Sequence, residues 1–282
     1  MERVAIIGAG ELGGAAAHLL ARRDLVRSIT LVDESGRVAA GKALDIAQAA
    51  PIEGFATTVS GSNDVSSASG ASIVVLADRV GGGEWQGEDG MLLLKRLAQT
   101  ASGAIIVCAG AAQRELVDRG VRELRFARGR LFGSAPEALA GAARALVALA
   151  VDGSPRDVAL SVLGVPPDHT VIPWADATIS GFTLTRLVDE PSRRRLRGRI
   201  AALWPPGPYA LAAAVTLAIE VMAGRSRRTT SCFVAPDSQE RSGTHTRTGA
   251  LPVRLGAAGI VDVVVPQLSA VEKVALDNAM QL

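Results

Sequence analysis

The feature that most constrains this chain is a glycine-rich turn between a short apolar run and an alanine-rich segment. The apolar run covers residues 4–7, the turn reads GAGELG at 8–13, and the alanine-rich segment covers 15–22. A buried strand, a G-x-G-x-x-G turn and a helix, in this order, form the start of a Rossmann unit. The first glycine allows the tight turn, the second a close approach of the backbone to a ligand, and the third close packing of helix on strand. A glycine-rich turn in another kind of α/β protein is the structural alternative.

The next strand completes the pattern and indicates the ligand. Residues 28–32 are apolar and end in Asp33, about 20 residues past the last glycine, where the fingerprint has an acid. A carboxylate there can accept hydrogen bonds from an adenosine ribose, and with Glu34 it would repel a 2′-phosphate. A helix N-terminus suits the phosphates. We therefore predict NAD rather than NADP as cofactor, bound by Gly8, Gly10, Glu11, Leu12, Gly13 and Asp33.

Composition excludes several classes of protein. With 282 residues, 48% of them hydrophobic, the chain can form about two globular domains and is not a disordered protein. The net charge is +2 and aromatics make up 3%, so the arginine runs at 193–195 and 225–228 are interpreted as solvated helix faces and ends, not as a nucleic-acid surface. We also predict no membrane segment and no metal site. Cys108 and Cys232 in apolar contexts, and an N-terminus that goes directly into a strand, favour the cytoplasm.

Strand and helix patterns alternate along the first half of the chain, which predicts a doubly wound parallel sheet. The predicted strands are 4–7, 28–32, 55–59, 73–77, 104–109 and 131–133, and the predicted helices are 15–22, 38–48 (stopped by Pro51), 91–100, 117–126 and 136–150. The pattern then changes to a mixed α+β arrangement. Strands are expected at 158–163, 170–174 and 182–184, helices at 192–204 and 209–223, an antiparallel meander at 230–235, 253–255 and 259–265, and a last helix at 269–281, capped by Ser269 and Glu272. We predict a dinucleotide-binding domain at 1–133 and a second domain at 134–282.

The order of these motifs resembles the lactate/malate dehydrogenase family, nearer its malate branch. The similarity includes GAGELG at 8–13, LVDE at 31–34, GKALDIAQAAPIEG at 41–54, GSND at 61–64, VLG at 162–164, LPVRLGAAGI at 251–260 and EKVALDNA at 272–279. The resemblance implies hydride transfer between NAD and a 2-hydroxy acid such as malate. It also implies a homodimer or homotetramer.

The family's catalytic residues are not found where the resemblance places them. A His general base, an Asp that orients it and arginines that bind the substrate carboxylate are expected. The matching positions hold Pro166 for the base, Leu139 for the acid, and Ala142 and Glu88 for two arginines. The turn at 108–112 lacks the family's Asn, and Asp78 and Arg79 replace small residues beneath the cofactor, which predicts weaker NAD binding. Acids at 84, 88 and 89 would repel a dicarboxylate.

Two weak substitutes for the lost catalytic groups remain. His169, three residues past Pro166, is a candidate displaced base, whereas His18 lies on the first helix and His245 in a polar loop. Glu137 and Arg144 lie seven residues apart on one helical face and could form a substitute pair. Loss of Asp and His together avoids an unpaired buried charge. The sequence thus predicts an impaired or inactive dehydrogenase; the alternatives are a non-catalytic nucleotide-binding or interaction protein and a dehydrogenase for an uncharged substrate.

Overall fold

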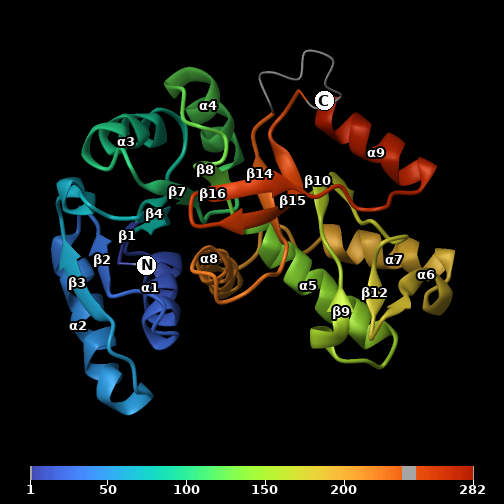
Figure 1. The fold of residues 1–282 in the computed structure, drawn as a ribbon, viewed down its shortest axis with the longest axis horizontal. Coiled ribbons are helices and arrows are strands. Elements are labelled where there is room, and N and C mark those ends of the chain that lie inside the picture. Colours follow the sequence, from blue (N-terminus) through green and yellow to red (C-terminus); the bar gives the residue numbers. More distant parts are fainter. Residues whose placement is uncertain (1, 237–245, 282) are drawn as a thin grey trace.

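The computed structural model describes residues 2–236 and 246–281 (Figure 1). Its first half is a parallel sheet, as predicted, and its strands lie in the order β8-β7-β4-β1-β2-β3. The strands are β1 (Arg3–Ile7), β2 (Ser28–Val32), β3 (Thr58–Ser62), β4 (Ile73–Leu76), β7 (Ile105–Cys108) and β8 (Leu131–Gly133). This is the strand order of a dinucleotide-binding Rossmann fold, whose ligand crevice lies at the carboxyl ends of the strands on either side of the first.

Helices cover both faces of this sheet. They are α1 (Glu11–Arg22), α2 (Gly36–Glu53), α3 (Gly87–Thr100) and α4 (Arg114–Leu124), with a 3₁₀ turn η1 (Val65–Ala68). Side chains alternate along a strand, so Val4 and Ile6 pack in one apolar cluster with α1, while Ala5 and Ile7 pack in another with α3 and α4.

The second half extends the same sheet with antiparallel strands. Its strands are β14 (Thr230–Val234), β15 (Gly249–Gly256), β16 (Gly259–Val263), β10 (Leu163–Val165) and β11 (His169–Val171), and β14 joins β8 through Phe233 opposite Gly133. A separate three-stranded sheet contains β9 (Val158–Ala159), β12 (Thr178–Ile179) and β13 (Phe182–Thr183). The pairing of β14, β15 and β16 confirms the predicted meander.

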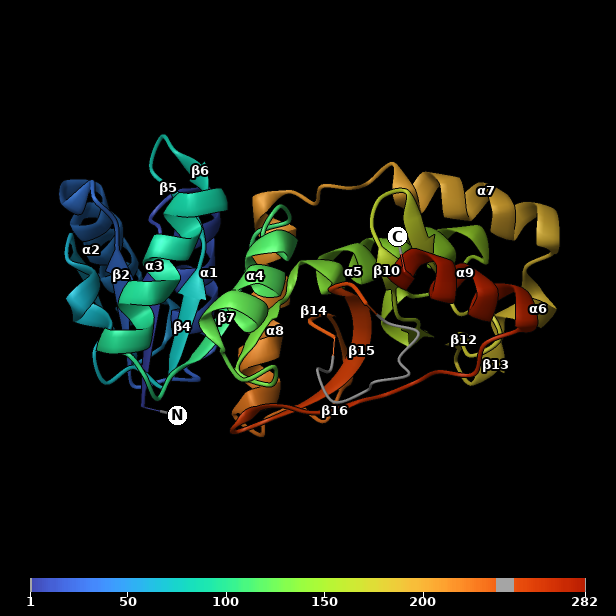
Figure 2. The same ribbon diagram turned by 90° about the horizontal axis from the view of Figure 1, so that it is seen from above.

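The helices of this half are α5 (Ala135–Ala150), α6 (Leu184–Leu187), α7 (Glu190–Ala201), α8 (Pro208–Met222) and α9 (Ala270–Gln281), with a 3₁₀ turn η2 (Pro155–Asp157). Helix α8 contacts both α1 and α5, and Figure 2 shows it between the two halves. The fold is therefore the predicted parallel sheet followed by a mixed α+β part, while the boundary after residue 133 stays a prediction.

Three details of the prediction are wrong. Helix α2 continues through Pro51 to Glu53, because a proline in the last turn removes only its own N–H; Gly54, at φ +77°, ends the helix by donating to Ala50 O. The third strand begins at Thr58, three residues later than expected. The run 158–163 is not one strand: β9 pairs with β12, and β10 pairs in the main sheet with β11 and β15.

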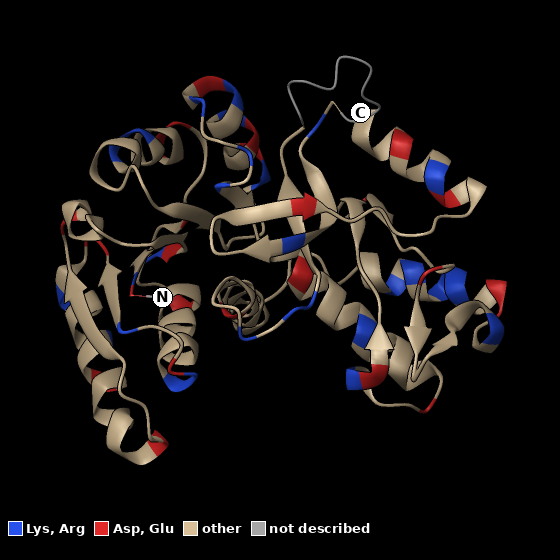
Figure 3. Ribbon diagram, viewed as in Figure 1, with Lys and Arg blue, Asp and Glu red and all other residues tan. Residues whose placement is uncertain are grey.

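Charges are distributed over the surface of both halves (Figure 3). Helix α7 carries most of one arginine run with Arg194 and Arg195 exposed, as expected for a solvated helix face. Within residues 2–236 and 246–281, no helix is long and apolar enough to cross a membrane, and no three His, Cys, Asp or Glu side chains form a group suited to a metal ion.

Candidate functional site

The glycine-rich turn has the geometry that its sequence predicts. Gly8 has φ +116°, and a Cβ there would lie 2.4 Å from Asp78 O. A Cβ on Gly13 would lie 1.9 Å from Gly8 O. Both positions therefore require glycine for the turn from β1 into α1, whether or not a ligand binds.

Asp33 lies at the carboxyl end of β2, at the crevice, and is only 5% exposed. Its Oδ2 accepts hydrogen bonds from the N–H groups of Ala9 at 2.9 Å and Val80 at 3.0 Å. Its Oδ1 accepts the N–H of Ser35 at 2.9 Å. Backbone donors from three segments thus hold the Asp33 carboxylate at the crevice, and its role in ribose binding stays a prediction.

The loop after β4 forms a hairpin that the sequence did not predict. Strands β5 (Asp78–Arg79) and β6 (Gly83–Glu84) pair with Asp78 opposite Glu84. Gly81 in the turn and Gly83 at the start of β6 both have positive φ. Figure 2 shows the hairpin at one end of the parallel sheet, near α1 and α3. The hairpin places two carboxylates in the crevice.

The carboxylate of Asp78 lies against the glycine-rich turn. Its Oδ1 accepts the N–H of Gly13 at 3.0 Å, and its backbone oxygen accepts the N–H of Gly10 at 2.9 Å. A Cβ on Gly10 would lie 2.2 Å from Asp78 Oδ2, so the carboxylate fills the space that this glycine leaves open. Lys42 donates from Nζ to Gly10 O at 2.6 Å.

The pyrophosphate of a dinucleotide does not fit beside this carboxylate. In the fingerprint, the backbone at the second glycine approaches the pyrophosphate and the N-terminus of the following helix donates to it. Here a negatively charged side chain from the same protein occupies that space and accepts one of those N–H groups. The glycines and Asp33 therefore match the sequence pattern of an NAD-binding protein. In this conformation, however, Asp78 occupies the phosphate cradle, which is the space between the glycine-rich turn and the N-terminus of α1.

Glu84 caps the turn that follows β7. Its two carboxylate oxygens accept the N–H groups of Ala111 at 3.0 Å and Ala112 at 2.8 Å. A Cβ on Gly110 would lie 2.2 Å from Glu84 Oε2. Burial raises the pKa of Glu84 above its ordinary value of 4.5, and the nearby Asp78 adds to the rise, against the lowering effect of the two backbone donors.

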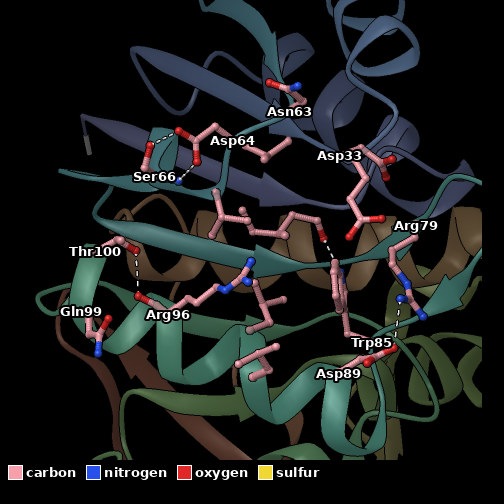
Figure 4. A pocket seen from close by; sticks show the side chains of 16 residues that line it. Asp33, Asn63, Asp64, Ser66, Arg79, Trp85, Asp89, Arg96, Gln99 and Thr100 are labelled. Atoms are coloured by element: carbon pink, nitrogen blue, oxygen red, sulfur yellow. Dashed lines mark hydrogen bonds and ion pairs between the residues drawn. The ribbon is translucent and has the colours of Figure 1, made fainter.

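Arg79 and Trp85 attach the hairpin to the carboxyl end of β1 in the parallel sheet (Figure 4). The indole N–H of Trp85 donates to Ile7 O at 3.3 Å, and the side chain is 9% exposed. The guanidinium of Arg79 lies 4.6 Å from the centre of that indole ring and 3.4 Å from Asp89 Oδ2. The contact with Trp85 is a cation–π interaction. That Arg79 lies beneath a cofactor stays a prediction.

A cavity of about 650 Å³ remains beside the hairpin. Its lining combines the apolar ends of β1 and β2 with side chains from the hairpin and from the segments around η1 and α3. The lining residues labelled in Figure 4 include Asp33, Asn63, Arg79, Trp85, Asp89 and Arg96. This volume is in the range of small-molecule sites in proteins.

Glu137 and Arg144 form the pair that the sequence suggested. Arg144 Nη1 lies 2.7 Å from Glu137 Oε1, and the two side chains are 14% and 4% exposed. Backbone groups also bind both side chains: Arg144 Nε donates to Leu160 O at 3.1 Å, and Glu137 Oε2 accepts the N–H of Ser231 at 2.8 Å. The pair joins α5 to β14 and to the segment before β10, which is a structural role.

Known proteins share the sequence pattern and the fold of this chain. Residues 2–99 match the family model of the lactate/malate dehydrogenase NAD binding domain. The malate dehydrogenase of Desulforudis audaxviator is 27% identical across 99% of this chain and 95% of its own length. Among solved structures, malate dehydrogenase from Salinibacter ruber covers 98% of this chain and 93% of its own, with TM-score 0.85 and 24% identity. The lactate dehydrogenase of Cryptosporidium parvum complexed with lactic acid and β-nicotinamide adenine dinucleotide has TM-score 0.88 at 18% identity, covering 99% and 95%.

The chain is thus similar to the lactate/malate dehydrogenases: its residues 2–99 resemble their NAD binding domain, and nearly its whole length aligns with curated malate dehydrogenases. In this dehydrogenase homologue, the positions assigned to the catalytic residues lie in ordinary packing environments. Pro166 is buried in the turn between β10 and β11, and Leu139 is fully buried in an apolar cluster with Ala143 and Val162. Ala142 is half-buried on the same helix, and Glu88 is paired with Arg119 at 2.8 Å.

The structure describes two of the three histidines. His169 is exposed on β11, where it pairs in register with Val165. His18 lies on α1 with Nε2 3.1 Å from Glu53. His245 lies outside the described residues. The sequence reasoning missed the roles of Asp78 and Glu84; an acid directly after a buried strand, beside a glycine-rich helix start, was the available signal.

Proposed function

We propose that this chain is a non-catalytic member of the dehydrogenase family, one that uses the scaffold for binding rather than for hydride transfer to 2-hydroxy acids. The observation that carries the proposal is Leu139: at the position assigned to the orienting acid, it is a fully buried member of an apolar cluster. A carboxylate in that cluster would have no water and few donors around it, so the position is built for packing.

The other assigned positions support the same proposal. Proline has no side-chain proton to exchange, so Pro166 cannot act as a general base, and a general base typically contributes about 10²–10⁴-fold to a rate. Ala142 and Glu88 cannot form the bidentate contact with a substrate carboxylate that an arginine makes. Both carboxylate oxygens of Glu137 already accept hydrogen bonds, from Arg144 and from Ser231 N–H, which disfavours Glu137 as a general base.

Turnover measurements test the proposal. The purified protein would be assayed with NAD and malate or lactate, and with NADH and oxaloacetate or pyruvate, in parallel with the malate dehydrogenase of Desulforudis audaxviator. We expect rates several orders of magnitude below that relative, and no dependence of a residual rate on a group that titrates near neutral pH. Robust turnover in either direction would refute the proposal.

The second candidate function is an active dehydrogenase with a displaced base. His169 is the specific feature that favours it, because its strand pairs with β10 next to Pro166 and its side chain is exposed. If turnover were observed, His169→Ala would decide between the two. Abolished turnover would identify the displaced base, whereas an unchanged rate would leave Glu137 to be tested.

A further inference from the structure

The hairpin at residues 78–84 is attached to the crevice at several independent points. Asp78 accepts the N–H of Gly13, Glu84 accepts those of Ala111 and Ala112, and Val80 donates to Asp33. These contacts cover the glycine-rich turn, the end of β2 and the turn after β7. A dinucleotide on a Rossmann fold uses these same regions.

The glycine-rich turn shows what occupies its anion-binding space. A hydrogen bond from a helix N-terminal N–H to an ionised carboxylate is charge-assisted and stronger than a neutral one. The Asp78 carboxylate makes such a bond at 3.0 Å and packs against the bare Cα of Gly10. It offers to the turn what a phosphate oxygen would offer. Phosphate and carboxylate cannot both lie there, because they would compete for the Gly13 N–H and repel one another.

We infer that Asp78 is a built-in occupant of the phosphate cradle and that it selects against ligands carrying a phosphate at this position. A dinucleotide must displace the Asp78 carboxylate before it binds, so its affinity is lowered by the free energy of the contacts that this side chain makes with the turn. Lys42, the cation beside the turn, donates to Gly10 O and has no hydrogen bond to the Asp78 carboxylate among those of the described residues. The inference concerns binding and stands apart from the proposed absence of hydride transfer.

Two substitutions at one position separate charge from bulk. Asp78→Asn keeps an oxygen that can accept the Gly13 N–H and removes the negative charge. Asp78→Ala removes both. Glu88→Gln is the charge-matched control: Glu88 lies ten residues further along the chain, 82% of its side chain is exposed, and its partner is Arg119 rather than the cradle.

Calorimetric titration with NADH tests the inference, with adenosine as the ligand that lacks phosphate. We expect NADH to bind Asp78→Ala roughly tenfold or more tightly than the unaltered protein, with Asp78→Asn between the two. Adenosine affinity should be the same in all variants, and Glu88→Gln should behave as the unaltered protein.

Three results would overturn it. Equal NADH affinity in the unaltered protein and Asp78→Ala, whether tight or undetectable, would mean that Asp78 does not control access. An equal gain for adenosine would place the effect outside the phosphate cradle. An equal gain in Glu88→Gln would assign it to general charge. None of these results depends on turnover, so failure here is distinguishable from failure of the proposed function.

Discussion

The Glu137–Arg144 pair gives a prediction that separates a structural role from a catalytic one. Glu137→Ala removes two contacts at once: the charged hydrogen bond from Arg144 at 2.7 Å and the bond from Ser231 N–H at 2.8 Å. A hydrogen bond to a charged group contributes about 1.5–3 kcal/mol, and an orphaned buried donor costs about 1–3 kcal/mol. We expect a loss of about 3–5 kcal/mol in the free energy of unfolding, which is the range for breaking a buried ion pair.

Two further variants sharpen this prediction. Glu137→Gln keeps one acceptor oxygen, for either Arg144 or Ser231 N–H, and turns an NH₂ donor toward the other, so it loses the charge and one of the two hydrogen bonds. We expect a loss of about 1.5–3 kcal/mol, smaller than that of Glu137→Ala. Glu123→Ala is the matched control, because Arg119 Nε lies at the same 2.7 Å from Glu123 Oε1 but the Glu123 side chain is 50% exposed. An exposed i,i+4 pair contributes about 0.3–0.5 kcal/mol.

Urea unfolding followed by circular dichroism measures all three variants, with the midpoint and slope fitted together. The reasoning fails if Glu137→Ala costs no more than Glu123→Ala, because burial would then contribute nothing to the pair. It also fails if Glu137→Ala unfolds normally yet abolishes a measurable turnover, since that result would assign Glu137 to catalysis instead of to packing.

Three other predictions concern titration, thiol reactivity and capping. The raised pKa of Glu84 means that the folded protein binds the carboxyl proton more tightly than the unfolded chain does. The contribution of this proton to the free energy of unfolding is therefore greatest below pH 4.5 and is lost as the pH rises through the folded-state pKa. The difference in that free energy between the unaltered protein and Glu84→Gln, measured by urea unfolding, should fall over the same pH range. Burial raises the pKa of Cys108 well above its usual range and that of Cys232 to about 12, so a disulfide reagent at pH 8 should label neither thiol in the folded protein and both in urea. Glu272→Ala should cost about 2–4 kcal/mol in urea unfolding, because the buried carboxylate accepts the N–H groups of both Ser269 and Trp174.

Much of the fold was predictable because it depends on local patterns. The apolar runs that became β1, β2 and β4 are short and buried on both sides, which is typical of a parallel sheet covered by helices. Ser269 and Glu272 form the expected capping box, with Ser269 N–H donating to Glu272 at 2.7 Å. These features are encoded within a few residues of each other, so a sequence alone indicates them.

The candidate site was predictable only in part, because its occupants depend on long-range placement. Asp33 follows the strand expected, but its contact with Val80 requires the hairpin to fold back across 47 residues of sequence. The strands β5 and β6 have two residues each, too short for a period to be visible. The prediction of one strand at 158–163 was wrong for a similar reason, since a mostly apolar stretch does not reveal that its two ends pair in different sheets.

The changes around the crevice follow from one physical requirement. The first N–H groups of a helix have no partner within the helix, and they need an acceptor from a ligand, from water or from the protein. In a dinucleotide-binding site the cofactor's phosphates would supply it. Here Asp78 supplies it to Gly13 in the first turn of α1, while Glu84 accepts the N–H groups of Ala111 and Ala112 in the turn that precedes α4. The retained glycines then have a structural reason, since Gly8 and Gly13 shape the turn and Gly10 leaves room for the Asp78 carboxylate. All three glycines of the G-x-G-x-x-G turn can therefore be retained in a protein whose own carboxylate accepts an N–H group of that turn. Measuring NADH affinity in the Asp78 variants tests this explanation directly.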